Sequence, residues 1–330
     1  MTFLEVKDLE VEFQVDKKSV KPIERISFEM NEGEVLGIVG ETGSGKSLTA
    51  HAILGLSTLV GGIIGGSIKF EEQDLLLISE KEMQSIRGSQ ISLIPQNPMT
   101  SLDPVYRVGD QIVEGLTQHA KISKREAKQQ VIDLMGRLRI PKANRVFQQY
   151  PHQLSGGLKQ RIVIAMGLCT NPRLLIADEP TTALDVTVQA QIMRLFREMT
   201  EDRGIGLFLI THDLGVIAQV CNKVAVMYAG NMVEFGKIET VFNTPSHPYT
   251  NALLDCIPYI GMKKGSLSAI YGNVPSAGNY PSGCRYHPRC PQSFSPCETT
   301  VPALFQIEGE TRVACHLYQA VSYTHLTLPT

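Results

Sequence analysis

The feature that most constrains the fold is a glycine-rich octapeptide between an apolar run and a helix-forming run. It reads Gly40-Glu41-Thr42-Gly43-Ser44-Gly45-Lys46-Ser47, and it follows the apolar residues 35–39 and precedes 48–56. This pattern predicts a phosphate-binding loop, because glycines let backbone N–H groups crowd around phosphate oxygens and the helix N-terminus adds a favourable dipole. Lys46 is expected to reach the β- and γ-phosphates, and the Ser47 hydroxyl to hold Mg²⁺. A glycine-rich turn without a ligand is the alternative, and the strand-loop-helix context disfavours it.

Composition is that of an ordinary globular protein. The 330 residues leave room for one large domain and an appendage, and 43% hydrophobic residues suffice for a normal core. The net charge of −2 provides no global basic field that would attract nucleic acid or anionic lipid. No stretch approaches roughly 18 unbroken apolar residues, and residues 1–5 lack the pattern of a signal peptide. Because the phosphate loop implies intracellular nucleotide, we expect a cytoplasmic chain whose cysteines are reduced thiols or metal ligands.

Strand and helix patterns alternate along the chain. Short alternating strands are expected before residue 31, a flexible loop at 61–66, and further strands at 67–70, 91–94, 174–177 and 207–210. Residues 106–150 are expected to be mostly helical, so the pattern indicates a largely parallel sheet covered by helices. Beyond a break at 243–248 the chain is rich in Gly, Pro and Cys. Residues 321–330 fit no earlier pattern, and we treat them as a cloning or sequencing scar.

Two acidic residues end one of the later apolar strands. The run 174–177 leads into Asp178 and Glu179. Asp178 is expected at the carboxyl end of the strand, near the Mg²⁺ shell, and Glu179 beside the water that attacks the γ-phosphate. A strand running into an acidic turn is a common pattern by itself. Its place after a phosphate loop and directly before 180–185 favours the catalytic interpretation.

A second anion-binding pattern precedes those acids. Ser155, Gly156 and Gly157 open the helical run that ends at Leu168. Ser155 can cap that helix, and the two glycines let its free N–H groups approach an anion. An ordinary capped helix is the alternative, and it does not explain why two glycines precede so good a helix.

Together these motifs resemble the ATP-binding subunit of an ATP-binding-cassette transporter. The resemblance covers roughly residues 3–240 and consists of six motifs in one order: 40–47, Gln96, 154–157, 178–179, 183–185 and His212. Leu158 departs from the glutamine common in the family signature, and the oligopeptide branch often has an apolar residue there. The resemblance implies an α/β fold: a P-loop NTPase cassette with a RecA-like parallel-sheet core, an N-terminal antiparallel β subdomain, a helical signature subdomain and a small Cys-containing C-terminal extension.

The resemblance also implies roles for single residues. Phe13 matches the aromatic residue that stacks on adenine, and a strand core residue is the alternative. Gln96 matches the loop glutamine that touches Mg²⁺ and senses the membrane partner. Ser155, Gly156 and Gly157 would contact the γ-phosphate bound to the opposite subunit. His212 matches the switch histidine beside that phosphate, so Lys46, Glu179 and His212 are the expected catalytic residues.

Two further segments narrow the resemblance to the dipeptide and oligopeptide uptake branch. They are 96–104 and 244–250, and that branch also carries tail cysteines. Here they are Cys284, Cys290, Cys297 and Cys315, with the spacing C-x5-C-x6-C-x17-C. The spacing lacks the close pairs of zinc sites, and four thiolates on irregular loops favour a [4Fe–4S] cluster. Zinc and four unligated thiols remain alternatives. We expect the tail to be independent of phosphate chemistry, because nothing in the sequence links the two.

The implied function is ATP hydrolysis, with Mg²⁺, that drives import of dipeptides or oligopeptides through a separate permease. The implied partners are a second ATPase subunit, identical or related, two membrane permease subunits and, indirectly, an extracytoplasmic solute-binding protein. The chain would be peripheral, at the cytoplasmic face of the membrane. We expect an ATP-binding domain at 1–243, with its helical subdomain at about 97–160, and an oligopeptide-transporter C-terminal region at 244–320.

Three alternatives are weighed against this function. The same role for nickel or another solute stays open, because separate proteins select the solute. A non-transport ATPase acting on nucleic acid or the ribosome predicts basic surfaces or a tandem cassette, and neither is seen in the sequence. An inactive regulatory ATPase is disfavoured by the intact Lys46, Glu179 and His212.

Overall fold

The computed structural model describes residues 2–182, 184–257 and 269–318, which form two compact units. The first, here called the helical unit, comprises Asn31–Val35 and Leu77–Ile210. The second, here called the sheet unit, comprises Thr2–Met30, Leu36–Leu76 and the described residues from Thr211 onward. The segment 321–330, expected to be a scar, lies outside the described residues, as does Ala183. In the part of the chain that is described, no helix is both long enough and apolar enough to cross a bilayer.

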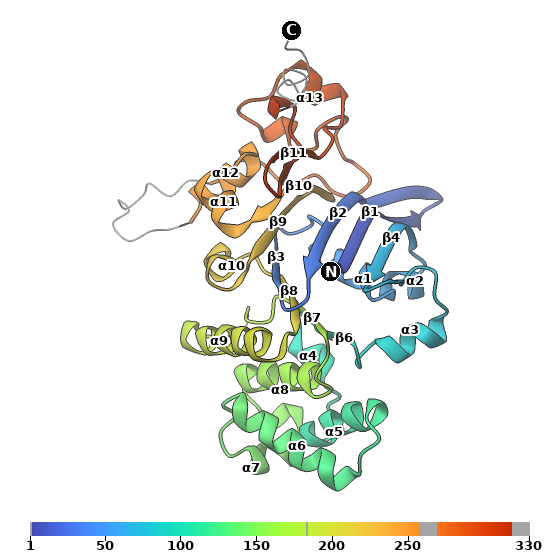
Figure 1. Cartoon of the computed structure of the whole chain (residues 1–330), viewed down its shortest axis with the longest axis vertical. Coiled ribbons are helices and arrows are strands. Elements are labelled where there is room, and N and C mark those ends of the chain that lie inside the picture. Colours follow the sequence, from blue (N-terminus) through green and yellow to red (C-terminus); the bar gives the residue numbers. More distant parts are fainter. Residues whose placement is uncertain (1, 183, 258–268, 319–330) are drawn as a thin grey trace, which may run out of the picture. The chain divides into compact units, whose positions relative to one another are not determined.

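The helical unit combines buried parallel strands with a group of packed helices (Figure 1). Its elements are α3 (Glu80–Ile86), β6 (Ile91–Ile94), α4 (Pro98–Ser101), α5 (Val108–His119), α6 (Lys124–Arg137), α7 (Ala143–Phe147), the 3₁₀ turn η1 (Pro151–Gln153), α8 (Gly156–Leu168), β7 (Leu174–Asp178), α9 (Val186–Arg203) and β8 (Gly206–Ile210). Strand β7 pairs in parallel with β6 and with β8. Its apolar residues are buried on both faces, as expected for a covered parallel strand.

Local sequence explains where the helices of this unit begin. Ser123 and Glu126 form a capping box at the start of α6, and Ser79 and Glu82 do the same for α3. Helices α5, α6 and α8 contact one another, and their buried residues include Ile112, Val131 and Ile164. The prediction of a mostly helical stretch at 106–150 is confirmed, as are the strands at 91–94, 174–177 and 207–210.

The sheet unit contains an antiparallel sheet and a mixed sheet (Figure 1). Its elements are β1 (Thr2–Val15), β2 (Lys18–Asn31), β3 (Val35–Val39), α1 (Lys46–Ile53), α2 (Leu56–Leu59), β4 (Ile63–Phe70), β5 (Gln73–Asp74), α10 (Leu214–Val220), β9 (Lys223–Tyr228), β10 (Asn231–Lys237), α11 (Ile238–Asn243), α12 (Pro248–Asp255), η2 (His287–Arg289), α13 (Ser295–Thr299), β11 (Phe305–Glu308), β12 (Thr311–Val313) and η3 (His316–Tyr318). The first sheet has the order β2-β1-β4-β5, and in the second the strands of this unit follow the order β11-β12-β10-β9-β3. Among the described pairs of these five strands, β3 and β9 are parallel, and the other pairs are antiparallel.

The prediction of a flexible loop at 61–66 is wrong for most of that stretch, because residues 63–66 belong to strand β4. Strand β4 begins at Ile63, where it pairs with Glu12 of β1, and Gly65 pairs with Glu10. The glycines suit this strand because β1 approaches closely: a Cβ on Gly66 would lie 2.4 Å from the Asp8 carbonyl oxygen. Glycine in a strand here marks a close approach of backbone rather than a loop.

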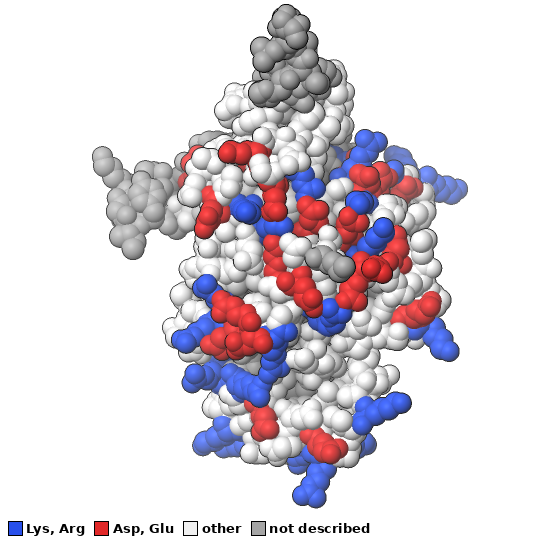
Figure 2. All heavy atoms as spheres, in the orientation of Figure 1, with Lys and Arg blue, Asp and Glu red and all other residues white. Residues whose placement is uncertain are grey.

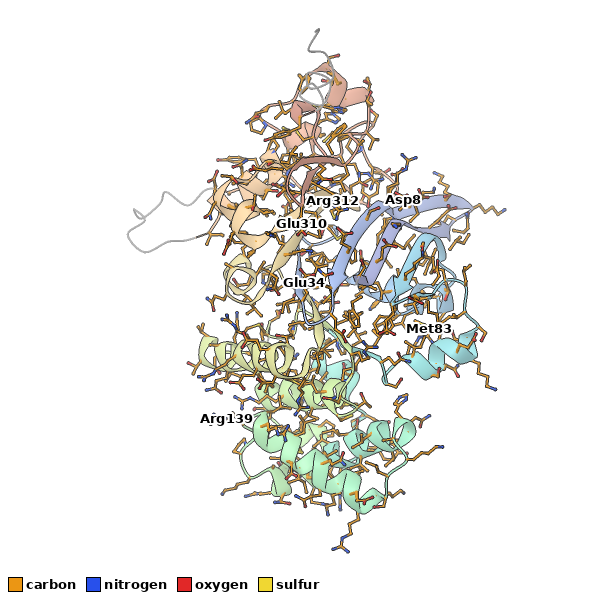
Figure 3. All side chains as sticks on the ribbon, viewed as in Figure 1. Asp8, Glu34, Met83, Arg139, Glu310 and Arg312 are labelled. Carbon is orange, nitrogen blue, oxygen red and sulfur yellow. The ribbon has the colours of Figure 1, made fainter. Side chains whose placement is uncertain are left out.

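The C-terminal extension is continuous with the mixed sheet. Strand β12 pairs with β10, with Val313 opposite Glu234, and β11 pairs with β12. Arg312 of β12, labelled in Figure 3, donates to the Glu29 carboxylate at 3.1 Å. On the face shown in Figure 2, basic and acidic side chains are interspersed within each unit.

Candidate active site

The predicted phosphate loop lies in the sheet unit, between β3 and α1. Gly40 has a φ of 150° and lies so close to strand β9 that a Cβ would be 2.1 Å from the Met227 carbonyl oxygen. Gly45, with a φ of 100°, precedes α1 in the left-handed conformation. Ser44 is buried, whereas Thr42 and Gly43 are exposed. The conformation of the loop therefore requires glycine at these positions. The N-terminus of α1 follows the loop directly, as in a phosphate-binding site.

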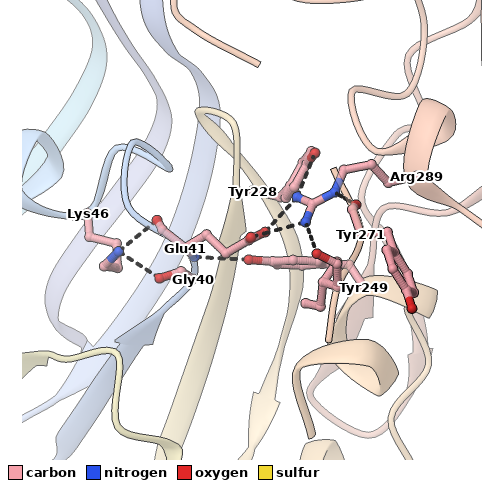
Figure 4. Close-up of polar contacts among 8 residues, drawn as sticks. Gly40, Glu41, Lys46, Tyr228, Tyr249, Tyr271 and Arg289 are labelled. Carbon is pink, nitrogen blue, oxygen red and sulfur yellow. Dashed lines mark hydrogen bonds and ion pairs between the residues drawn. The ribbon is translucent and has the colours of Figure 1, made fainter. Parts of the chain in front are cut away.

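Lys46 folds back over this loop. Its ammonium donates to the carbonyl oxygens of Gly40, at 2.7 Å, and Glu41, at 2.9 Å (Figure 4). The side chain is buried, and the neighbouring Ser47 is half-buried at the start of α1. Because the lysine side chain is flexible, its ammonium can exchange these carbonyl oxygens for phosphate oxygens as hydrogen-bond acceptors without a change in the loop backbone.

Glu41 is anchored to the C-terminal segment. Its carboxylate receives two hydrogen bonds from the Arg289 guanidinium, at 2.7 and 3.1 Å, and its backbone N–H donates to the Tyr249 hydroxyl at 3.0 Å (Figure 4). Arg289 directly precedes Cys290. The expectation that nothing links the tail to the phosphate loop is wrong, because chain folding places a tail arginine against this glutamate.

The predicted acids lie in the helical unit, at the end of β7. Asp178 is buried there, and Glu179 follows with a φ of 44°, a conformation that few non-glycine residues adopt. The Glu179 carboxylate accepts from the Gln96 amide at 3.0 Å and from the Thr182 hydroxyl at 3.0 Å. A carboxylate held by two donors at a strand end can act on a reactant placed beside it.

The glycine pair of the signature segment lies in the same unit. Ser155 caps α8, and its hydroxyl accepts from the Leu158 N–H at 3.4 Å. Gly156 and Gly157 form the first turn of α8, and a Cβ on Gly156 would meet nothing within 4 Å. The helix thus opens with two residues that have no side chain, and there is open space beside Gly156, as suits an anion-binding terminus.

Two remaining nucleotide-site candidates belong to the sheet unit. His212 is exposed just before α10, whose N-terminus is capped by Asp213. Phe13 is half-buried in β1, and its ring would lie 2.9 Å from a Cβ on Gly62. Phe13 therefore packs along the backbone of that glycine in this structure.

The four tail cysteines lie between residues 284 and 315, and two of them are joined through their backbones. The Cys284 N–H donates to the Cys297 carbonyl oxygen at 2.8 Å. Burial, followed by the charges of Cys297, Cys315 and Cys290, raises the pKa of the Cys284 thiol to about 11. Burial raises the pKa of Cys315 as well, again with contributions from Cys290 and Cys297. Among the described residues, no group of three or more His, Cys, Asp or Glu side chains is arranged around a single metal ion.

Comparison with known proteins gives these motifs a family. Residues 23–182 match the model of the ABC transporter family, and residues 233–297 match the oligopeptide/dipeptide transporter C-terminal region. The chain is 44% identical to the oligopeptide transport ATP-binding protein AppD of Bacillus subtilis over 96% of its own length and 97% of that protein. The chain belongs to the ABC transporter ATP-binding family. As a member of that family it is an ATPase.

Other relatives of this ABC ATPase have related names. The dipeptide transport ATP-binding protein DppD of Escherichia coli is 44% identical, covering 96% of this chain and 97% of that protein. The oligopeptide transport ATP-binding protein OppD of Salmonella typhimurium is 46% identical, covering 91% and 89%.

Solved structures confirm the cassette fold. The post-hydrolysis dimer of the ATP-binding cassette MJ0796, bound to ADP and Pi, is similar with a TM-score of 0.65 and 24% identity, over 71% of this chain and 98% of that one. The structure of cbiO1 from Clostridium perfringens, part of the ABC transporter complex cbiONQ, has a TM-score of 0.62 and 28% identity, over 74% and 91%.

Sequence reasoning missed three residues that touch the predicted site. They are Thr182, Tyr249 and Arg289. Thr182 follows Glu179 by three residues, a spacing that lets a hydroxyl reach back to the carboxylate and could have identified it. Nothing in the local pattern of Tyr249 or Arg289 indicates their partner, because the contact spans most of the chain.

Proposed function

We propose that this ABC ATPase powers import of dipeptides or oligopeptides through a separate membrane permease. The observation that carries the proposal is the similarity to peptide-transport ATP-binding proteins along almost the whole chain. The match at 233–297 to a region described for oligopeptide and dipeptide transporters supports it independently of the nucleotide motifs. The net charge of −2 and the interspersed charges in Figure 2 favour transport over an action on nucleic acid.

We propose a nucleotide site made of the motif residues. We assign phosphate binding to Gly40, Glu41, Thr42, Gly43, Ser44, Gly45, Lys46 and Ser47, adenine stacking to Phe13, Mg²⁺ to Ser47, Gln96 and Asp178, and contact with the opposite subunit's γ-phosphate to Ser155, Gly156 and Gly157. Glu179 would accept a proton from the attacking water, and His212 would stabilise the transferred phosphoryl group. The hydroxyl and amide donors on the Glu179 carboxylate support this role, because they orient it.

The proposed assembly needs further chains. Its partners are a second ATPase subunit, identical or related, two permease subunits and, indirectly, an extracytoplasmic solute-binding protein. The chain would be peripheral, at the cytoplasmic face of the membrane. Residues 1–243 would act as the ATP-binding domain, with its helical subdomain at about 97–160, and 244–320 as the C-terminal region.

The function can be tested with the assembled transporter in proteoliposomes. Peptide uptake should require external peptide, its binding protein and internal MgATP, and peptide should raise ATP hydrolysis. Nickel or a glycoside as the only stimulating solute would replace the peptide assignment and leave the transport role intact. Stimulation by nucleic acid, without solute transport, would contradict the proposal.

We propose that the four tail cysteines hold a [4Fe–4S] cluster, because thiolates are the usual protein ligands of such clusters. The fold brings the backbones of two of them together, because the Cys297 carbonyl oxygen accepts a hydrogen bond from the Cys284 N–H. Burial, followed by the charges of the other three cysteines, raises the pKa of the Cys284 thiol, and a positively charged iron cluster would favour the thiolate. The cluster would serve as a structural cross-link or in partner contacts, held by Cys284, Cys290, Cys297 and Cys315.

Metal analysis of the anaerobically purified chain tests this assignment. Brown protein with iron and acid-labile sulfide in nearly equal amounts is expected. Colourless protein with stoichiometric zinc would replace the cluster by the zinc alternative. Protein without metal would leave four unligated thiols and refute both.

A further inference from the structure

A partly buried ion pair joins the phosphate loop to the cysteine-bearing segment. Arg289 and Glu41 lie 248 residues apart in sequence, and their side chains are only 6% and 29% exposed. The guanidinium meets the carboxylate with two parallel hydrogen bonds of 2.7 and 3.1 Å. Such a bidentate pair fixes orientation as well as distance, because both groups are planar. Figure 4 shows the two side chains pointing toward each other within the sheet unit.

The guanidinium is held on its other sides too. It donates to the carbonyl oxygen of Tyr271 at 2.7 Å, to that of Ile270 at 3.2 Å and to the Tyr228 hydroxyl at 3.3 Å. Arg289 cannot follow a displaced Glu41 without breaking these bonds. The arginine therefore acts as a fixed support for the loop.

Glu41 connects Arg289 to the lysine that is expected to bind phosphate, Lys46. Its backbone N–H is fixed by the Tyr249 hydroxyl, and its carbonyl oxygen accepts from the Lys46 ammonium at 2.9 Å. Tyr249 packs against Tyr228 and Tyr286 with ring centroids 4.7 and 5.2 Å apart. Tyr286 lies between Cys284 and Cys290 in the sequence. The packed tyrosines are therefore a second contact, besides the ion pair, between the phosphate loop and the cysteine-bearing segment.

We propose that Arg289 is a positioning residue for ATP binding: it holds the phosphate loop through Glu41 and makes nucleotide affinity depend on the cysteine-bearing segment. The inference rests on the assignment of residues 40–47 as the ATP phosphate site. It does not require a metal in the tail. A charge that fixes the loop without touching the reacting atoms should affect ATP affinity more than the rate of the chemical step.

A double-mutant cycle on the full chain tests the inference. MgATP affinity, KM and kcat are measured for the wild type, Arg289→Gln, Glu41→Gln and the double variant. Each single substitution should weaken ATP binding about tenfold, the loss expected for one charge-assisted pair, while kcat changes less. The double variant should be no weaker than the single ones, because both act through one contact. Arg289→Lys should recover part of the affinity, because it keeps the charge but not the bidentate geometry.

Arg312→Gln is the matched control. This arginine lies in the same C-terminal segment and is labelled in Figure 3, and its partners, Glu29 and the Phe235 ring, are outside the phosphate loop. Its loss should leave ATP affinity unchanged. Should Arg289→Gln fail to fold, Glu41→Gln and Arg289→Lys still test the contact.

Additive losses in the cycle, or unchanged affinity in both single variants, would overturn the role of Arg289. A separate arm tests the underlying assignment, since Lys46→Ala should abolish ATP hydrolysis and weaken binding. Normal ATP binding and hydrolysis by Lys46→Ala would refute the phosphate site itself, whatever the outcome at Arg289.

Discussion

Glu179 combines an unusual backbone with a well-held carboxylate. Its φ of 44° turns the chain directly after β7, and Gln96 and Thr182 both donate to its carboxylate. Glu179→Gln keeps the size of the side chain but removes its basicity. We expect ATP still to bind while turnover falls by about a hundredfold or more, the scale of a lost general base. Steady-state ATPase rates and size-exclusion chromatography should then find subunits trapped as an ATP-bound dimer. Turnover near the wild-type rate would mean that another group activates the water.

Thr182 offers a smaller and more specific effect. Its hydroxyl donates to the Glu179 carboxylate at 3.0 Å, so Thr182→Val removes one orienting hydrogen bond with little change in shape. We expect kcat to fall about threefold to tenfold, as for one lost hydrogen bond, with ATP affinity unchanged. Thr187→Val, at an exposed position of α9, is the control. Equal kcat values in the two variants would show that Glu179 needs no support from Thr182.

At the scale of elements, helix α12 begins with a cap that depends on pH. His247 is buried, its Nδ1 accepts from the Tyr249 N–H at 3.0 Å, and burial lowers its pKa from 6.5 to about 3. The neighbouring Glu234 accepts from the Ser246 and His247 N–H groups, and burial raises its pKa. Because the unfolded state binds a proton near pH 6.5 and the folded state does not, His247 destabilises the fold progressively as pH falls from about 6.5 towards 3.

His247→Asn isolates this effect, since asparagine can cap the helix but does not titrate. Urea unfolding midpoints of the wild type and of His247→Asn are compared at pH 7 and pH 5. Glu234 is present in both proteins, so its effect on stability cancels in the difference between them. The wild type should lose stability relative to the variant as the pH falls. Parallel curves would contradict a neutral buried His247.

At the scale of the whole molecule, the tail and the nucleotide loop belong to one packed structure. Strands β11 and β12 extend the sheet that includes β9, and Arg289 reaches Glu41. Cys290→Ser should therefore remove the proposed cluster and also weaken ATP binding, because Arg289 is the adjacent residue. In a Glu41→Gln background the same substitution should cause no further loss of affinity. Metal content and MgATP titration of the four proteins check this, and unchanged affinity in Cys290→Ser alone would show that the tail does not control the loop.

Sequence alone determined the features that are encoded within a few consecutive residues. The phosphate loop depends on glycines whose positive φ angles other residues avoid, and on the helix that starts directly after it. The Ser155 cap and the buried strand before Asp178 are equally local. The strand within the glycine-rich stretch at 61–66 was mispredicted, because its pairing with β1 outweighs the local preference of glycine for a loop.

Only the tertiary structure decided which distant groups meet. Gln96 and Glu179 are 83 residues apart, and Glu41 and Arg289 are 248 apart, and nothing in the spacing of either pair predicts the contact. The hydrogen bond from the Cys284 N–H to the Cys297 carbonyl oxygen likewise depends on the tertiary structure. These contacts depend on how strands and aromatic side chains pack when apolar surface is buried. The energy of a buried ion pair or a shared hydrogen bond is gained only after that packing has brought both partners together.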